Sequence, residues 1–145
     1  FAAIKPGVLF SEINKACQEV LAKGLADMGV LTVSAEESLK PEVGLHRRWT
    51  LHGVIHHLGL DVHDCAQARK EMYLDAPLRE GMVLTVEPGL YIQPDDELFA
   101  PEYRGIGIRI EDDVVVTADG CRNLSEDIPR HPDDIEKWMK QILGR

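Results

Sequence analysis

The sequence predicts an α+β fold, because helix-like and strand-like segments follow one another without the regular alternation that a parallel sheet requires. Apolar residues recur at helical spacing over residues 11–28 and again after Pro132. Residues 82–86 and 106–117 are compact apolar runs of the kind that form strands. The 145 residues are 44% hydrophobic and 28% charged, a balance that suits one globular unit with a buried core.

The two expected helices carry recognisable end signals. Ser11 can cap the first helix, and Gly29 can end it. Pro132 occupies a favoured first position for the second helix, whose single apolar stripe we expect to dock on the sheet. That stripe consists of Ile135, Trp138, Met139, Ile142 and Leu143.

The strand signals are shorter. Residues 30–33 form a brief apolar run that is compatible with a strand. The strand over 82–86 is ended by Pro88 and Gly89, and residues 106–117 read as one long strand or a hairpin.

Composition excludes several classes of function. The chain has 25 Asp and Glu against 16 Lys and Arg, and the net charge of −9 argues against a nucleic-acid partner. The sequence contains no run of about 18 apolar residues, the length that a membrane-spanning helix needs. The three cysteines lie far apart and without CxxC spacing, so we expect small buried thiols in a reducing compartment, the cytoplasm. The chain begins with Phe1 and shows no signal peptide, so we expect a fragment of a longer protein.

Strand alternation separates the residues of 106–111 into two faces. One face is apolar and points to a core, whereas the other combines a charge pair with a glycine, which usually marks a close approach. A solvated surface strand would show the same alternation, but the segment reads as a central strand. The apolar face holds Ile106, Ile108 and Ile110, and the opposite face holds Gly107, Arg109 and Glu111.

Two further features point to chemistry. Glu87 ends an apolar strand, where a carboxylate is costly to desolvate unless it is paired or bound to a cation. Four of the six histidines, His52, His56, His57 and His63, lie within twelve residues. One histidine alone is more often structural, but this density favours metal binding or proton transfer.

His56, Glu87 and Glu111 together offer one imidazole and two carboxylates. Mixed nitrogen and oxygen ligands suit a divalent ion such as Mn, Co, Fe or Zn. Spacing alone does not establish that these side chains converge, so the residues by themselves indicate a metallohydrolase and no more.

Three blocks of the sequence are distinctive: HGVIHHLGLDVHD (52–64), GMVLTVEPGLYI (81–92) and YRGIGIRIEDDVVVT (103–117). In this order and spacing they resemble the pita-bread metallopeptidases, and among them aminopeptidase P, the Xaa-Pro aminopeptidase family. The resemblance implies an α+β pita-bread fold with a curved antiparallel sheet flanked by helices. It also implies a dinuclear centre, usually of Mn, held by Asp, Asp, His, Glu and Glu. Residues 1–145 would form the C-terminal portion of the catalytic domain.

The resemblance assigns metal ligands residue by residue. His56 resembles the histidine ligand, Glu87 the first glutamate ligand, and Glu111 the glutamate that bridges the two ions. The residue before the ligand histidine is small in the family, whereas here it is Ile55. In the family, the two aspartate ligands lie upstream of the first helix, and this sequence has no counterpart of them before residue 11. The family's amino-terminal domain has no counterpart in this sequence either.

The same resemblance assigns catalytic roles. The implied reaction is hydrolysis of the bond between an N-terminal residue and a penultimate proline by a metal-activated water. Glu87 would also accept a proton, His63 would donate to the developing oxyanion, and His52 would position the substrate. Arg109 resembles an arginine that supports the ligands, which agrees with the face it shares with Glu111.

The missing aspartates limit what this chain can do. Two divalent ions bring four positive charges, and the fragment offers two carboxylates, so we expect weak metal occupancy and little or no activity. Substrates would be peptides with proline at position two, and the protein would be a homodimer or homotetramer. A prolidase that cleaves only dipeptides, a metal-free pita-bread binding scaffold and a metal-free structural domain remain alternatives.

Overall fold

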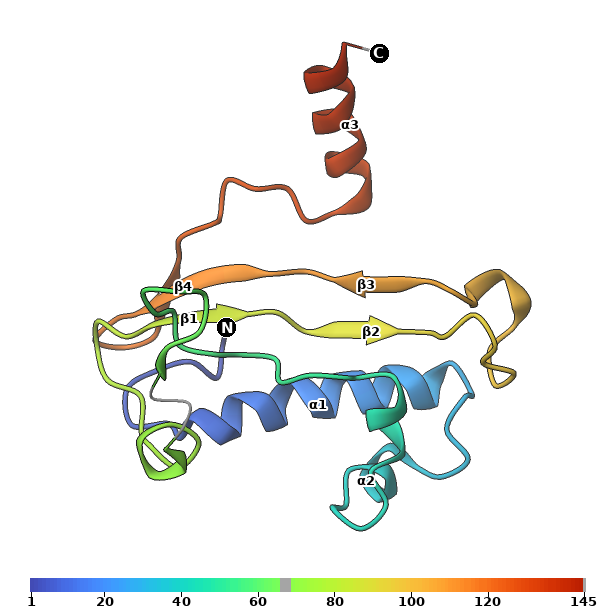
Figure 1. Cartoon of the computed structure of the whole chain (residues 1–145), viewed down its shortest axis with the longest axis horizontal. Coiled ribbons are helices and arrows are strands. Elements are labelled where there is room, and N and C mark those ends of the chain that lie inside the picture. Colours follow the sequence, from blue (N-terminus) through green and yellow to red (C-terminus); the bar gives the residue numbers. More distant parts are fainter. Residues whose placement is uncertain (66–68, 145) are drawn as a thin grey trace.

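The computed structural model describes residues 1–65 and 69–144 and shows two antiparallel sheets with helices beside them (Figure 1). In the described parts of the connections, 3₁₀ turns lie at Leu45–Arg48, Lys70–Met72 and Pro101–Tyr103. The helices are α1 (Phe10–Asp27), α2 (Ala35–Ser38) and α3 (Pro132–Leu143), and the strands are β1 (Val83–Val86), β2 (Gly89–Tyr91), β3 (Gly107–Arg109), β4 (Asp112–Val116) and β5 (Cys121–Asn123).

The two sheets form one interrupted ribbon. One sheet has the order β1-β4-β5, and the other pairs β2 with β3. Val86 lies opposite Asp112 where the first ladder ends, and Gly89 lies opposite Arg109 where the second begins. The same register therefore continues across a break of two residues on each side. The strand expected over 106–117 exists, but this break divides it into β3 and β4.

A further extended segment lies along the free edge of β1. The amide of Thr85 donates to the carbonyl of His56 at 2.9 Å, and the amide of Glu87 donates to the carbonyl of Val54 at 2.7 Å. The histidine-rich segment is thus a neighbour of the first strand.

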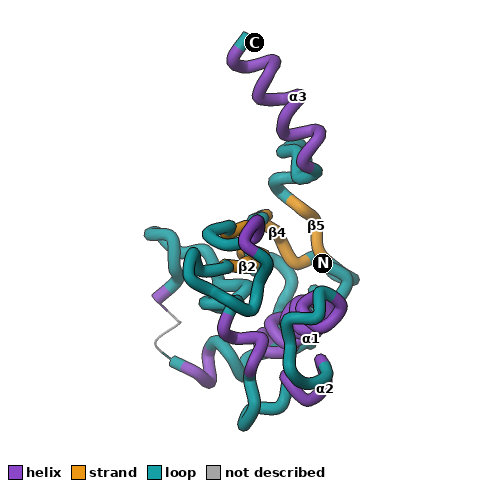
Figure 2. The backbone as a smooth tube through the Cα atoms, turned by 90° about the vertical axis from the view of Figure 1, so that its right-hand side faces the viewer, coloured by secondary structure: helices purple, strands orange, loops and turns teal. Residues whose placement is uncertain are grey.

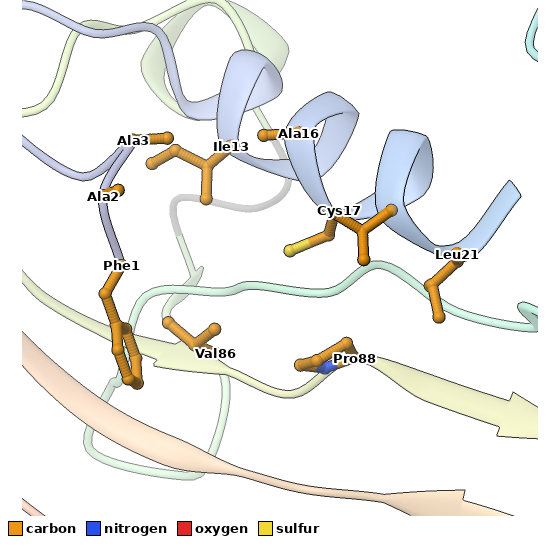
Figure 3. Close-up of a pocket in the computed structure, with 10 residues that line it drawn as sticks. Phe1, Ala2, Ala3, Ile13, Ala16, Cys17, Leu21, Val86 and Pro88 are labelled. Atoms are coloured by element: carbon orange, nitrogen blue, oxygen red, sulfur yellow. The ribbon is translucent and has the colours of Figure 1, made fainter. Parts of the chain in front are cut away.

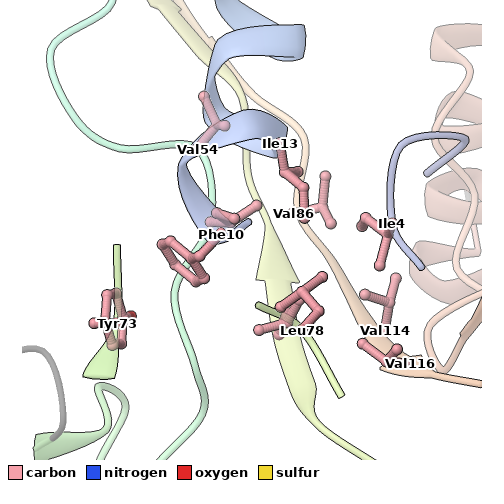
Figure 4. Packing of buried hydrophobic residues seen from close by; sticks show 11 residues of the cluster. Ile4, Phe10, Ile13, Val54, Tyr73, Leu78, Val86, Val114 and Val116 are labelled. Carbon is pink, nitrogen blue, oxygen red and sulfur yellow. The ribbon is translucent and has the colours of Figure 1, made fainter. Parts of the chain in front are cut away.

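The main core lies between α1 and the ribbon (Figure 4). It combines residues of α1, β1 and β4 with the chain's first residues and the segment that follows the 3₁₀ turn of Lys70–Met72. A second cluster, around Trp49, Phe99 and Leu25, packs at the other end of α1. The main cluster contains Ile4, Phe10, Ile13, Val54, Ile55, Tyr73, Leu78, Leu84, Val86, Val114 and Val116.

The first helix begins one residue earlier than expected and uses a different cap. Leu9 is the N-cap residue, and its amide donates to the carboxylate of Glu12 at 3.1 Å, so the expected cap, Ser11, lies inside the helix. At the other end Gly29 follows the helix with φ +72°, a left-handed conformation that suits glycine.

Two smaller expectations were wrong. Residues 30–33 are not a strand; Val30 is buried in the second core cluster, and Leu31 packs against that cluster. All three cysteines are free, but Cys65 is exposed rather than buried, whereas Cys17 and Cys121 are half-buried.

The expected docking of the last helix on the sheet was also wrong. α3 stands away from the body of the molecule, and its apolar stripe is largely exposed (Figures 1 and 2). The stripe has the amphipathic pattern of a packed helix, but no described element lies against it. Within the described residues, no helix is long and apolar enough to cross a membrane.

The isoleucine face of β3 is likewise exposed rather than in the core. Ile106, Ile108 and Ile110 are 42%, 58% and 44% exposed. These isoleucines belong to neither of the two core clusters, so in the described structure their face of β3 lies outside the core. On β4 the inward residues Val114 and Val116 are buried, so the main cluster ends where the ribbon breaks.

Candidate metal centre

Three side chains from three neighbouring segments meet at the break in the ribbon. His56 comes from the edge segment, Glu87 follows β1, and Glu111 lies between β3 and β4. One nitrogen or oxygen atom of each lies within 4.8 Å of the others. Nε2 of His56 is 3.2 Å from Oε1 of Glu87. The structure therefore brings together the three residues that the sequence indicated as metal ligands.

The ribbon's register explains why the two carboxylates are adjacent. Because Val86 faces Asp112 and Gly89 faces Arg109, Glu87 faces Glu111 across the break. Directly opposed side chains of antiparallel strands have neighbouring Cβ atoms. The backbone register thus holds two like-charged groups on one face.

Thr85 links the histidine to the first carboxylate. Its buried hydroxyl accepts the amide of His56 at 3.1 Å and lies 3.5 Å from Oε1 of Glu87. No motif in the sequence marks Thr85 as part of the site, although strand alternation places positions 85 and 87 on one face.

The His56 ring is oriented for coordination through Nε2. Its Nδ1 lies 3.1 Å from the carbonyl oxygen of His57, which can only accept a hydrogen bond, so Nδ1 carries a proton. Nε2 then faces a carboxylate oxygen of Glu87, and either a proton or a cation is needed between these two electron-rich atoms. An imidazole whose other nitrogen donates to a carbonyl is the usual form of a metal-ligating histidine.

Arg109 lies beside both carboxylates. Its Nε is 3.8 Å from Glu87 and its terminal nitrogen is 3.4 Å from Glu111, which agrees with the face expected to be shared by Arg109 and Glu111. The arginine is half exposed, so it moderates the negative charge from the rim of the site rather than from its centre.

A cavity of about 280 Å³ opens onto this cluster. His63 lies next to the candidate ligand, with its ring 4.4 Å from that of His56 between centroids. His52 is at the cavity wall, where Nε2 lies 2.7 Å from the hydroxyl of Tyr91. Tyr91 was not among the residues that the sequence indicated. The lining residues are His52, Gly53, Ile55, His56, His63 and Glu87.

The bulky Ile55, a departure from the family pattern, is accommodated by the core. Its side chain is 5% exposed and belongs to the main cluster, while the adjacent His56 lies at the site. The larger residue therefore packs into the core and also lines the cavity, and it leaves the histidine in reach of Glu87.

Comparison with known proteins assigns the class. The model of metallopeptidase family M24 matches residues 1–118, and the chain belongs to this family. Xaa-Pro aminopeptidase 1 of Streptomyces coelicolor is 55% identical over 143 residues, and the Xaa-Pro aminopeptidase of Escherichia coli K12 is 42% identical over 138. The aminopeptidase PepP structure of Pseudomonas aeruginosa superimposes with a TM-score of 0.88 at 38% identity. The expected α+β pita-bread fold is thereby confirmed.

The chain is much shorter than these relatives. The matches cover 99% and 93% of it, but only 29% of the Streptomyces protein and 30% of the Escherichia protein. Against the Pseudomonas structure it is covered completely and spans 32% of that chain. A zinc-substituted aminopeptidase P from E. coli, in complex with product, is also similar, with a TM-score of 0.84 at 40% identity.

Proposed function

We propose that this chain is the C-terminal part of the catalytic domain of an Xaa-Pro aminopeptidase that removes the N-terminal residue from peptides with proline at position two. The observation that carries the proposal is the convergence of His56, Glu87 and Glu111 within 4.8 Å, in a chain 55% identical to a protein named for this activity. The separation of the ligand atoms and the mixed donors fit divalent ions, for which we propose manganese.

We propose for the residues of the site the roles that the resemblance to aminopeptidase P implies. Divalent ions at such a site lower the pKa of water and polarise a carbonyl. Glu87, as a ligand that also faces the cavity, would accept the proton of the attacking water. His63 would donate to the oxyanion, and His52 would position the substrate at the cavity wall. Arg109 would hold the two carboxylates in place through its contacts with both.

The charge of the cluster supports an incomplete site in this chain. Two carboxylates, with Arg109 beside them, cannot balance two divalent ions. We therefore propose that the 145-residue chain alone binds metal weakly and is nearly inactive, and that upstream aspartates complete the site. The relatives' threefold greater length leaves room for that upstream part.

We propose that the upstream part packs against an apolar hollow. A cavity of about 380 Å³ lies between the first residues, α1 and the back of the ribbon (Figure 3). Val86 and Pro88 contribute its ribbon side, on the face opposite Glu87, and Cys17 contributes from α1. The exposed isoleucines of β3 continue this face, since Ile110 is opposite Pro88 in the ribbon's register. An apolar surface of this extent is typical of an interface with another part of the same protein.

Thiol labelling tests this packing. Burial raises the pKa of the Cys17 thiol, yet the side chain is only half-buried, so a small maleimide should label it in the 145-residue chain. In the longer protein the label should react with Cys17 at least tenfold more slowly, while exposed Cys65 keeps its rate. Equal Cys17 rates in both forms would contradict the placement.

Calorimetry with Mn²⁺ tests the metal site. The longer protein should bind two ions and cleave Xaa-Pro-Yaa peptides, and His56→Ala should abolish both properties. His131→Ala, which changes an exposed histidine before α3, should alter neither. Activity that survives His56→Ala would show that the ligand assignment is wrong, and two tightly bound ions with normal turnover in the 145-residue chain would refute the incomplete site.

The substrate assay separates the alternatives. A prolidase would cleave Xaa-Pro dipeptides and leave Xaa-Pro-Yaa peptides intact, whereas a binding scaffold would cleave neither. Retention of all three candidate ligands argues against the scaffold. A homodimer or homotetramer in the cytoplasm completes the proposal, and the three free cysteines agree with a reducing compartment. Light scattering on the longer protein tests the oligomeric state.

A further inference from the structure

Tyr91 bonds to a histidine 39 residues earlier in the chain. Its hydroxyl lies 2.7 Å from Nε2 of His52, and the two rings meet edge to face with centroids 5.5 Å apart. The backbone reinforces the side-chain contact, because the amide of Tyr91 donates to the carbonyl of Trp49 at 2.9 Å. Both the main chain and the side chain of Tyr91 therefore hold residues 49–52 against β2.

The other nitrogen of the His52 ring is also engaged. Nδ1 lies 2.7 Å from the carbonyl oxygen of Gly53, which can only accept, so Nδ1 carries the proton. In the neutral ring Nε2 is then an acceptor, and the Tyr91 hydroxyl must be its donor. These two bonds determine both the tautomer and the orientation of the ring.

Two glycines make room for the Tyr91 ring. A Cβ on Gly89, two residues earlier on the same strand, would lie 2.6 Å from the tyrosine oxygen, and a Cβ on Gly107, directly opposite, would lie 3.0 Å from Cδ1. Neither glycine has a positive φ, so space rather than backbone conformation requires glycine at both positions. The ring rests on the bare backbone of two paired strands, with its hydroxyl aimed at His52.

We propose that Tyr91 is a positioning residue, whose hydroxyl holds His52 as its Nδ1–H tautomer with the ring fixed at the wall of the cavity. Because both ring nitrogens form hydrogen bonds, His52 presents its uncharged ring to the cavity and has no free N–H group to donate to a ligand. The inference rests on the proposed function only for its consequence in catalysis. The tautomer itself is a property of this chain.

Nitrogen-15 NMR of the imidazole rings tests the tautomer directly. At about pH 8, above the ordinary histidine pKa of about 6.5, His52 should show a protonated Nδ1 and a bare Nε2. Tyr91→Phe, which keeps the ring and removes the hydroxyl, should convert His52 to a mixture of tautomers. Tyr103→Phe, at an exposed tyrosine in the turn before β3, is the matched control and should leave the spectrum unchanged. An unaltered single tautomer in Tyr91→Phe would overturn the proposal.

A second variant tests whether the position of the Tyr91 ring determines the tautomer. Gly89→Ala leaves Tyr91 intact but places a methyl group where its ring lies, so the ring must move and His52 should lose its single tautomer. Retention of that tautomer in Gly89→Ala would also count against the proposal.

The consequence for catalysis is measured on the longer protein. Loss of one neutral hydrogen bond corresponds to about a fivefold fall in kcat/KM for Tyr91→Phe. If the NMR result holds and the wild-type protein cleaves no Xaa-Pro peptide, the proposed function fails and the positioning role stands. If the peptide is cleaved and Tyr91→Phe changes neither the tautomer nor kcat/KM, the positioning role fails and the function stands.

Discussion

Asp96→Asn should destabilise the protein through the second core cluster. The Asp96 side chain is 1% exposed and accepts hydrogen bonds from Nε1 of Trp49 at 2.6 Å, Nε of Arg48 at 3.1 Å and the amide of Leu98 at 3.1 Å. Asparagine keeps the shape but replaces one acceptor oxygen by a donor. At least one buried donor is then left without an acceptor.

The tryptophan bond carries most of the expected effect. Arg48 is 58% exposed, and an ion pair to such a side chain contributes about 0–1 kcal/mol. The Trp49 bond is buried and charge-assisted, and bonds of this kind contribute about 1.5–3 kcal/mol. We therefore expect the free energy of unfolding to fall by about 2 kcal/mol, which corresponds to a fall in Tm of about 4–8 °C for a domain of this size.

Urea unfolding followed by far-ultraviolet circular dichroism measures the change. Asp95→Asn is the matched control, because this neighbouring carboxylate is exposed, and it should stay within about 0.5 kcal/mol of wild type. If Asp96→Asn were as stable as Asp95→Asn, the buried acceptor would not stabilise the fold and the reasoning would be refuted.

The effect should also depend on pH. Burial acts to raise the pKa of Asp96, but the hydrogen bonds from Arg48, Trp49 and Leu98 outweigh it and hold the pKa below its ordinary value of 3.8. A lowered folded-state pKa contributes stability that is present above the unfolded value and lost as pH falls through the folded value. The difference between wild type and Asp96→Asn should be constant from pH 7 to about 4.5 and shrink below about 3.8.

Three other predictions test the histidines and the exposed sheet face. Burial lowers the pKa of His46 and of His57 below 6.5, so the free energy of unfolding should fall as pH drops below about 6.5. This pH dependence should be less steep in His46→Gln, and it should match wild type in the exposed control His131→Gln. Ile108→Thr should change the free energy of unfolding of the 145-residue chain by less than about 0.5 kcal/mol, because this side chain is exposed. Val114→Thr, on the buried part of the same face, should cost about 1–3 kcal/mol because it buries a hydroxyl. A pH-independent stability in the first case, or equal costs for the two threonines in the others, would contradict the assigned environments.

Local sequence patterns predicted the residues of the site better than they predicted which apolar faces are buried. The MVLTV run gave a strand in the right place, and a carboxylate at its end had to find a partner, which is His56. Alternation correctly placed Arg109 and Glu111 together. Both inferences concern residues whose neighbours lie on the same or the adjacent strand, where period and register decide contact.

The failures concern surfaces that an apolar pattern marks but cannot assign. Ile108 alternates as a core residue does, and Trp138 lies on a stripe suited to packing, yet both are exposed in this chain. Periodicity identifies a face that needs a partner and is silent about which segment provides it. Tyr91 and Thr85 were missed for a different reason: their roles depend on hydrogen bonds to residues 29 to 39 positions away, which no local pattern encodes.

The register of the ribbon finally explains why this arrangement favours a cation. Two carboxylates within 4.8 Å of each other repel by about 3–4 kcal/mol at an effective dielectric constant of 20. Glu87 and Glu111 cannot move apart along the strands, because the ladders on both sides of the break share one register. Arg109 relieves part of the repulsion from the rim, at 3.4–3.8 Å. A divalent ion bound by the carboxylates and Nε2 of His56 would relieve the remaining repulsion. The fold therefore keeps the two carboxylates close together, and metal binding would remove the cost of that arrangement.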